Sequence, residues 1–268
     1  MQRSLREIRP TLALALPIIV GQVSQMLMGV TDSAMVGHAG TVPLAASSFG
    51  GNVFAVFYVL GIGLMLPVSI FASRARGAGR PAECAEYLRH GIALAFFFGL
   101  LETLLMAALS TQLHRFGQPA AVLAVVTPFF LLMAASLVPV FVYLVLRQFA
   151  EAMGRPWVPM LIMLGGVGLN AALNWVLIYG HLGSPALGLT GSGISTLISR
   201  TLGAVVIFVW LRCDPAMRAV WPSGGAAAKD QDGAAGDRNG AWFAPFSRGR
   251  FREMLHVGLP ASGMLSHE

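Results

Sequence analysis

The sequence predicts an all-α membrane protein, organised as a six-transmembrane-helix lobe followed by the start of a seventh helix. Hydrophobic residues make up 56% of the 268 positions and charged residues only 11%, which is about half the charged fraction of a typical soluble domain. Apolar runs of roughly 20 residues, long enough to cross a bilayer, recur from Thr11 almost to Leu211. The arginines gather in every second loop between these runs. These observations together indicate a helical bundle surrounded by a lipid bilayer.

Six membrane spans can be drawn in order along the chain. They cover Thr11–Val36, Leu44–Ser73, Cys84–Leu109, Ala120–Gln148, Trp157–Tyr179 and Leu189–Leu211. The first span follows a basic segment, as a cleaved signal peptide also would, but its length and its proline favour a retained helix. Prolines inside the spans should bend the helices, because proline removes a backbone donor. They stand at Pro17, Pro67, Pro128 and Pro139.

The charges of the loops predict the orientation of the chain. Basic residues precede the first span, separate the second from the third, flank the end of the fourth and surround the segment from Arg212 to Arg252, whereas the opposite loops contain only Arg115. Basic loops stay in the cytoplasm, so we predict a multi-pass protein of the bacterial inner membrane with a cytoplasmic N-terminus. The net charge of +6 follows from this topology. Without a basic stripe and interleaved aromatics, no nucleic-acid partner is expected.

Three regions are predicted from the composition. Residues 1–212 form the six-helix lobe, residues 213–250 a flexible cytoplasmic linker rich in glycine and alanine, and residues 251–268 the start of helix 7. After the linker the sequence resembles its own beginning when Pro260 is aligned with Pro17. A duplication of six-helix units explains this similarity, and the two units would then be parallel repeats. We therefore expect a C-terminal lobe to be missing from these 268 residues.

One acidic residue in the first span is the clearest candidate for function. Asp32 lies towards the outer end of an otherwise uncharged apolar run. An ionisable side chain inside a bilayer is costly, by at least about 2.5 kcal/mol on insertion scales, and is a functional candidate by default. Such a carboxylate can take up a proton or hold a cation. The alternative is that Asp32 lies just outside the hydrocarbon and caps a helix.

Further polar residues in the spans extend this candidate site. Asn170 and Asn174 are four residues apart, hence on one face of a helix, and Thr196 is predicted at a comparable depth on the next span. With Asp32 they supply oxygens that suit a hard cation such as Na+ or a proton network. In the alternative interpretation, the amides only hydrogen-bond neighbouring helices.

Two other charged residues fall within the predicted spans. They are Glu102 and Arg200. They could pair with each other or with Asp32, and the sequence leaves these possibilities open. Cys84 and Cys213, the only cysteines, lie at predicted cytoplasmic helix ends, so neither a disulfide framework nor a zinc site is expected. No cofactor is predicted.

Several motifs resemble the multidrug and toxin extrusion (MATE) family. The segment 173–180, LNWVLIYG, followed by GSP at 183–185 and GSGIST at 191–196, is similar to the passage from helix 5 to helix 6 of those transporters. Leu16-Pro17 with GVTDSAMVG at 29–37 resembles the family's first helix. Further similarities are GIG at 61–63 and RQFAEAMGRP at 147–156. The resemblance covers essentially the whole chain in order.

The resemblance implies secondary active multidrug efflux, in which organic, often cationic or amphipathic, compounds are exchanged for Na+ or H+. It implies that Asp32 is the coupling carboxylate. Glu268 resembles a helix 7 glutamate that contributes to cation binding in NorM-like members. One branch of the family has an acid at the place of Asn174. The amide found here departs from that branch and favours a NorM-like protein.

Two alternatives to drug efflux fit the sequence less well. A lipid-linked saccharide flippase of the same superfamily would be expected to carry several basic residues inside the bundle, where only Arg200 is available. A membrane-embedded enzyme would need a catalytic motif, and the sequence contains no HExxH or GxSxG pattern. We therefore predict that the protein is not an enzyme.

Overall fold

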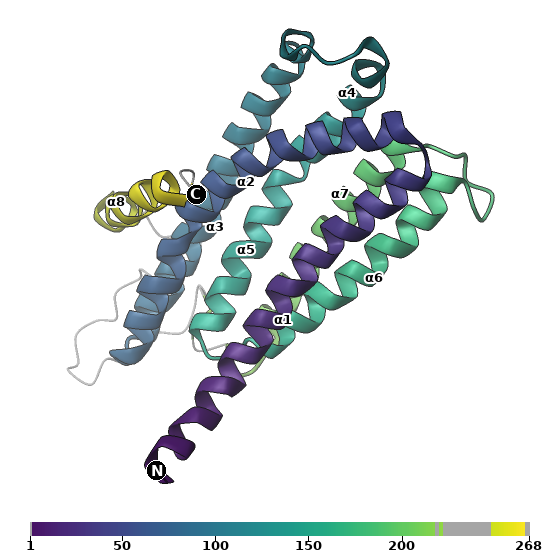
Figure 1. The fold of residues 1–268 in the computed structure, drawn as a ribbon. Coiled ribbons are helices and arrows are strands. Elements are labelled where there is room, and N and C mark those ends of the chain that lie inside the picture. The colour runs from purple at the N-terminus through teal and green to yellow at the C-terminus, as the bar shows by residue number, and fades with distance from the viewer. Residues whose placement is uncertain (1, 218–219, 222–247, 266–268) are drawn as a thin grey trace.

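The computed structural model describes residues 2–217, 220–221 and 248–265, and in these ranges it contains helices and no strand. Figure 1 shows the long helices gathered into one bundle. The helices are α1 (Gln2–His38), α2 (Thr41–Gly77), α3 (Pro81–Ser110), the short 3-10 helix η1 (Leu113–Phe116), α4 (Ala120–Ala135), α5 (Leu137–Ala152), α6 (Trp157–Tyr179), α7 (Leu189–Cys213) and α8 (Arg248–Leu265).

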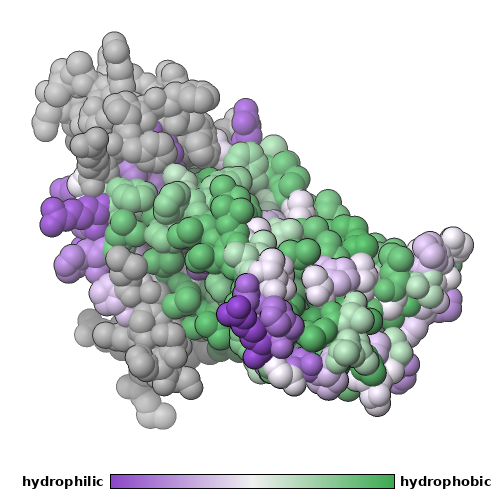
Figure 2. Space-filling model, turned by 90° about the horizontal axis from the view of Figure 1, so that it is seen from above, coloured by the Kyte–Doolittle hydropathy of each residue, from purple (hydrophilic) through white to green (hydrophobic). Residues whose placement is uncertain are grey.

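The predicted all-α membrane fold is confirmed. Within the described residues, five helical stretches are long and apolar enough to cross a membrane. They are Thr41–Gly77, Pro81–Ser110, Ala120–Ala152, Trp157–Tyr179 and Leu189–Cys213, which match the second to sixth predicted spans. The first predicted span lies within α1. Hydrophobic side chains cover much of the described surface in Figure 2, as expected for helices that face lipid.

The fourth predicted span, Ala120–Gln148, lies within one apolar stretch, Ala120–Ala152, that is interrupted at a single residue. Helix α4 ends at Ala135 and α5 begins at Leu137, with Ser136 between them, next to one of the prolines that were predicted to bend the spans. Pro139 explains the break, because a proline cannot donate to the carbonyl four residues earlier and its ring clashes with it. This carbonyl belongs to Ala135, the last residue of α4.

The helices pack in a continuous order around the bundle. α1 packs mainly along α6, α6 along α7, and α7 against α4 and α5. α2 packs against α3, α4 and α5, and contacts α1 more sparsely. Glycines allow close approaches between helices: a Cβ on Gly191 of α7 would lie 2.6 Å from the carbonyl oxygen of Leu177, and a Cβ on Gly61 of α2 would lie 1.9 Å from the ring of Phe141. The backbones of α6 and α7 therefore lie in direct contact.

The basic ends of the helices meet at one end of the bundle. Arg76, near the end of α2, donates a 3.0 Å hydrogen bond to the carbonyl of Ala152 at the end of α5. Arg155 forms a 3.5 Å ion pair with Asp214, which follows α7. The connection between α3 and α4 lies at the opposite end from the N-terminus in Figure 1. The predicted basic loops thus share one end, as the predicted topology requires, and the orientation itself stays a prediction.

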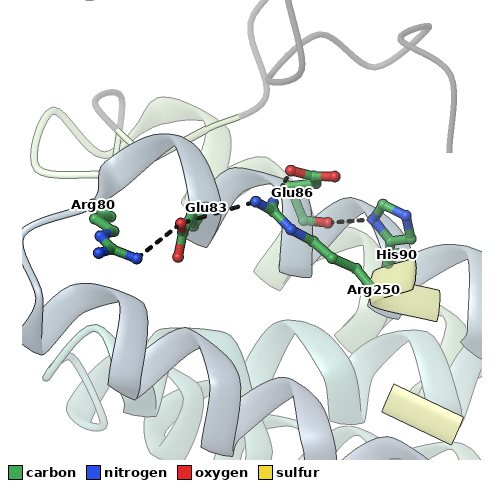
Figure 3. A network of polar contacts seen from close by, with 5 residues as sticks. All are labelled: Arg80, Glu83, Glu86, His90 and Arg250. Carbon is green, nitrogen blue, oxygen red and sulfur yellow. Dashed lines mark hydrogen bonds and ion pairs between the residues drawn. The ribbon is translucent and has the colours of Figure 1, made fainter. Parts of the chain in front are cut away.

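A charged cluster attaches α8 to the first turns of α3. Arg250 forms ion pairs with Glu86 and, at 3.9 Å, with Glu83, which also pairs with Arg80 at 3.3 Å (Figure 3). The Arg250 guanidinium lies 5.4 Å from the centre of the Tyr87 ring. α8 also packs along α2. Most of the predicted linker, residues 218–219 and 222–247, lies outside the described residues.

Candidate functional site

The site candidates lie around a cavity in the middle of the bundle. Its volume is about 450 Å³, within the range of roughly 300–1,000 Å³ that is typical of small-molecule sites. Residues of α1, α2, α4, α5, α6 and α7 line it, and most of them are apolar or aromatic. The polar and charged side chains in its wall include Gln25, Asp32, Thr196, Ser199 and Arg200. The cavity therefore combines a broad apolar surface with a few fixed polar groups.

The predicted cluster around Asp32 comes together in the structure. Asn174 Nδ2 donates a 2.5 Å hydrogen bond to Asp32 Oδ1 and lies 3.2 Å from Asn170 Oδ1. Asn170 and Thr196 face the same carboxylate. Both asparagines are fully buried, whereas Asp32 is half-buried at the cavity wall. The amide of Asn174 therefore joins α6 to α1 through the carboxylate, an arrangement that is compatible both with a coupling site and with a contact that only joins the helices.

The sequence explains why these groups meet. The four-residue spacing of Asn170 and Asn174 puts both amides on the face of α6 that packs against α1. Nearer the ends of these helices, the Tyr179 hydroxyl donates a 2.8 Å hydrogen bond to the carbonyl of Met35. The close approach at Gly191 brings α7, and with it Thr196, to the same place.

Two amide atoms of this cluster lack a partner among the described residues. They are Asn174 Oδ1 and Asn170 Nδ2, both buried. A buried polar atom without a hydrogen bond is destabilising by about 1–3 kcal/mol, so such atoms commonly mark a place for a ligand or water. The oxygens of Asp32, Asn174 and Thr196 form a donor set that fits a hard cation such as Na+. A proton on Asp32 would suit the same surroundings.

Arg200 lies in the wall of the same cavity. Its guanidinium donates a 2.6 Å hydrogen bond to the hydroxyl of Ser136, in the break between α4 and α5, and lies 4.6 Å from the centre of the Phe54 ring. It also acts electrostatically on Asp32. One of the pairings that the sequence left open, Arg200 with Asp32, is therefore present as an attraction across the cavity rather than as a direct ion pair.

An aromatic column forms another part of the wall and was missed in the sequence. Phe54 stacks on Tyr58 with ring centres 5.7 Å apart, and Tyr58 stacks on Phe141 at 6.3 Å. Gln25 of α1 donates a hydrogen bond to the Tyr58 hydroxyl. The four-residue spacing of Phe54 and Tyr58 was visible in the sequence, but no pattern indicated that Phe141 of another span would continue the column.

A buried arginine lies between α5 and α1, one helical turn beyond the cavity wall. Arg147 follows Tyr143, a residue of the cavity wall, by one turn of α5. Its guanidinium lies against α1 at Gly21, where an added Cβ would be 3.4 Å away. A 2.7 Å ion pair with Glu151 compensates its charge. In the sequence, Arg147 indicates only the cytoplasmic end of a span, and no pattern there predicts its contact with α1.

Two predicted residues do not join the cluster. Glu102 of α3 is buried, its Oε2 has no hydrogen-bond partner within the described ranges, and it is not among the residues that line the cavity. It therefore does not pair with Asp32 or Arg200. Glu268 lies outside the described residues. The described part of the chain contains no group of three or more His, Cys, Asp or Glu side chains that could hold a metal ion.

Comparison with known proteins finds relatives over most of the chain. The MatE family profile matches residues 17–176. A probable multidrug resistance protein NorM from Neisseria meningitidis serogroup A is 31% identical over 208 residues, which cover 77% of this chain and 45% of that protein. The corresponding protein from Mesorhizobium japonicum is 29% identical over 268 residues, covering 98% and 53%. The chain thus spans about half the length of these relatives.

Solved structures show the same fold. The outward-facing conformation of a multidrug resistance MATE family transporter superposes with a TM-score of 0.78 at 23% identity, covering 96% of this chain and 52% of that one. The inward-facing conformation gives a TM-score of 0.76 at 22% identity, covering 96% and 54%. The helical architecture is therefore shared with transporters in both conformations.

Proposed function

The chain belongs to the MATE family, and on that premise we propose that it takes part in secondary active multidrug efflux, exchanging organic compounds for Na+ or H+. Its relatives are named as probable multidrug resistance proteins. They are about twice as long as this chain, so their activity is carried over here as a proposal.

One observation carries the proposal most directly: a carboxylate in the wall of a largely apolar cavity, held by neutral amides. Asn174 donates to Asp32, and the oxygen of the same amide is buried without a partner among the described residues. An ion or proton that binds Asp32 changes the charge beside the cavity. A cationic compound in the cavity is attracted to the free carboxylate and less so to the occupied one.

This competition supplies the coupling that an antiporter needs. Ion binding at Asp32 would remove the need for the hydrogen bond from Asn174, which joins α1 to α6. A half-turn of the Asn174 amide would then direct its unpartnered oxygen towards the ion. A ligand shifts a conformational equilibrium only by its differential affinity for the two states. We therefore propose that ion binding repositions α1 against α6.

The proposed function requires a membrane location and a second lobe. We propose that the lobe lies in the bacterial inner membrane with its N-terminus in the cytoplasm, in contact with the lipid bilayer. We further propose that it works with a second lobe, the partner expected from the internal repeat. In such transporters the substrate path lies between repeats, and alternating access comes from one repeat moving against the other.

The alternative functions receive less support. A flippase for lipid-linked saccharides would need basic groups for a pyrophosphate, and Arg200 is the one arginine or lysine in the described cavity wall. An enzyme would need a nucleophile or a base in reach of a reacting group. The cavity instead offers an apolar surface with one carboxylate and one guanidinium, which suits binding and release.

Replacing Asp32 by asparagine tests the proposal. In proteoliposomes with an imposed Na+ or H+ gradient, Asp32→Asn should abolish gradient-driven efflux while membrane insertion stays normal, because an amide neither takes up a proton nor provides a negative ligand. Asp214→Asn is the matched control, since that carboxylate follows α7 and pairs with Arg155 away from the cavity. Unaltered ion dependence in Asp32→Asn would remove this residue from the mechanism.

A further inference from the structure

Arg200 brings a positive charge into the cavity that ion coupling at Asp32 does not use. It lies in the middle of α7, on the same helix as Thr196, and both line the cavity. Burying a guanidinium in a membrane protein is costly unless it is compensated or used. A positive charge also opposes the entry of a purely cationic compound, which is one of the kinds of substrate expected from the family resemblance.

The structure holds this guanidinium in a defined position. The Ser136 hydroxyl donates its own hydrogen to the carbonyl of Met133 at 2.7 Å, so its oxygen lone pairs are left to accept from Arg200. The Phe54 ring beneath the guanidinium adds a cation–π contact. The arginine is therefore anchored by groups that do not neutralise its charge.

Most of the binding capacity of Arg200 stays open. A guanidinium has five N–H donors, and the described residues accept one hydrogen bond from it, at Ser136. No carboxylate in the described ranges forms an ion pair with it within 4.0 Å, in contrast to Arg147 and Arg155, which pair with Glu151 and Asp214. The free edge of a guanidinium fits a carboxylate through two parallel hydrogen bonds.

We propose that Arg200 binds an acidic group of the exported compound, so that the cavity selects amphipathic zwitterions with a cationic group near Asp32 and a carboxylate at Arg200. This inference rests on the proposed efflux function and names its substrate class. The two charges come from different helices, α1 and α7, across a wall that is otherwise largely apolar. A compound with separated opposite charges on an aromatic frame is complementary to all three features.

A purely structural role for Arg200 explains these contacts less well. If the arginine served only as a counter-charge, Asp32 would be its natural partner, yet Asp32 takes its hydrogen bond from Asn174. The anchoring groups of Arg200 are instead Ser136 and Phe54. The guanidinium is thus held apart from the carboxylate, which leaves both charges available to a ligand.

A matched pair of dyes tests the proposal. Rhodamine 110 carries a cationic xanthylium and a carboxylate, and rhodamine 123 is its methyl ester and lacks the negative charge. Binding of each dye to the purified 268-residue chain in lipid nanodiscs can be measured by equilibrium dialysis, with empty nanodiscs as background. The unsubstituted protein should prefer the zwitterion, and Arg200→Gln should weaken zwitterion binding by about tenfold or more without weakening ester binding.

Two further variants support the interpretation of this experiment. Arg212→Gln removes an arginine from the end of the same helix, outside the cavity wall, and should leave both affinities unchanged. Arg200→Lys keeps the charge but loses the paired donors, so it should retain part of the preference for the zwitterion. If Arg200→Gln fails to fold, a reduced preference in a folded Arg200→Lys still supports the proposal, and a full preference overturns it.

The outcomes separate this inference from the efflux proposal. Binding of neither dye to the unsubstituted protein would refute the drug-binding cavity, and this inference with it. Equal affinities for the two dyes, or equal losses in Arg200→Gln, would leave efflux standing and overturn the role of Arg200. Competition by dodecyl phosphate but not by dodecanoate would assign the arginine to a phosphate headgroup and would also overturn it.

Discussion

Replacing Gly61 by alanine should disturb the cavity from a position that does not line it. An added Cβ would lie 1.9, 2.3 and 2.6 Å from three ring atoms of Phe141, which is fully buried. The Phe141 ring stacks on Tyr58, and Tyr58 is part of the cavity wall. Phe141 must therefore move, and the aromatic column that it supports must move with it.

The magnitude follows from two opposing effects. Overpacking a tight core costs roughly 1–3 kcal/mol, and this contact belongs near the upper end because the obstacle is a buried ring. Replacing a glycine inside a helix by alanine gains about 0.5–1 kcal/mol in conformational entropy. We expect a net destabilisation of about 2 kcal/mol. Gly51→Ala in the same helix is the control, because nothing lies within 4 Å of its added Cβ.

Unfolding with a denaturing detergent in mixed micelles measures this difference. Gly61→Ala should unfold at a lower detergent fraction than the unsubstituted protein, and Gly51→Ala should not. Adding Phe141→Leu to Gly61→Ala should give a combined loss smaller than the sum of the single losses, because the two positions are in contact. Equal stability of Gly61→Ala and Gly51→Ala would refute the packing argument, and additive losses would show that Phe141 is not the obstacle.

Two further predictions concern topology and length. In a background lacking Cys84 and Cys213, single cysteines introduced at Gly233 and at Ser184 should be labelled from opposite sides of the membrane. If an impermeant reagent outside intact cells labels Gly233→Cys, the proposed orientation is inverted. Residues 1–268 expressed alone should insert into the membrane without conferring ion-coupled drug resistance, whereas the chain extended by a second lobe should confer that resistance. Equal resistance from the short and the extended chain would make the short chain a self-sufficient half-transporter.

Much of the fold could be predicted from the sequence because the bilayer constrains helices strongly. A span must satisfy all its backbone groups internally, so a long apolar run has few alternatives to a helix. The prediction placed Trp157–Tyr179 with the bounds that α6 has in the structure. A bend at Pro139 was predicted but the interruption at Ser136 was not, because a proline within a long apolar run can either bend or interrupt a helix. Only the packing of α5 against its neighbours decides between them.

The candidate site was predicted in part for a similar reason. Asp32, Asn170 and Asn174 stand out in the sequence because polar groups inside apolar spans are few and need partners. The surroundings of Arg200 could not be found in this way. Its partners, Ser136 and Phe54, come from other spans and carry no distinctive pattern. Phe141 and Gly61 meet across 80 positions of sequence, and one chain alone gives no indication of such a contact.

The amide of Asn174 and the guanidinium of Arg200 determine how the single carboxylate of this site, Asp32, can bind an ion and a substrate. A second acid at position 174 would place two negative charges side by side, and one of them would have to hold a proton. The amide instead donates to Asp32 and leaves its negative charge in place. Arg200 balances that charge across the cavity without pairing with it. An incoming ion and the cationic end of a substrate must therefore compete for one carboxylate, while the arginine stays free to bind the substrate's acidic end.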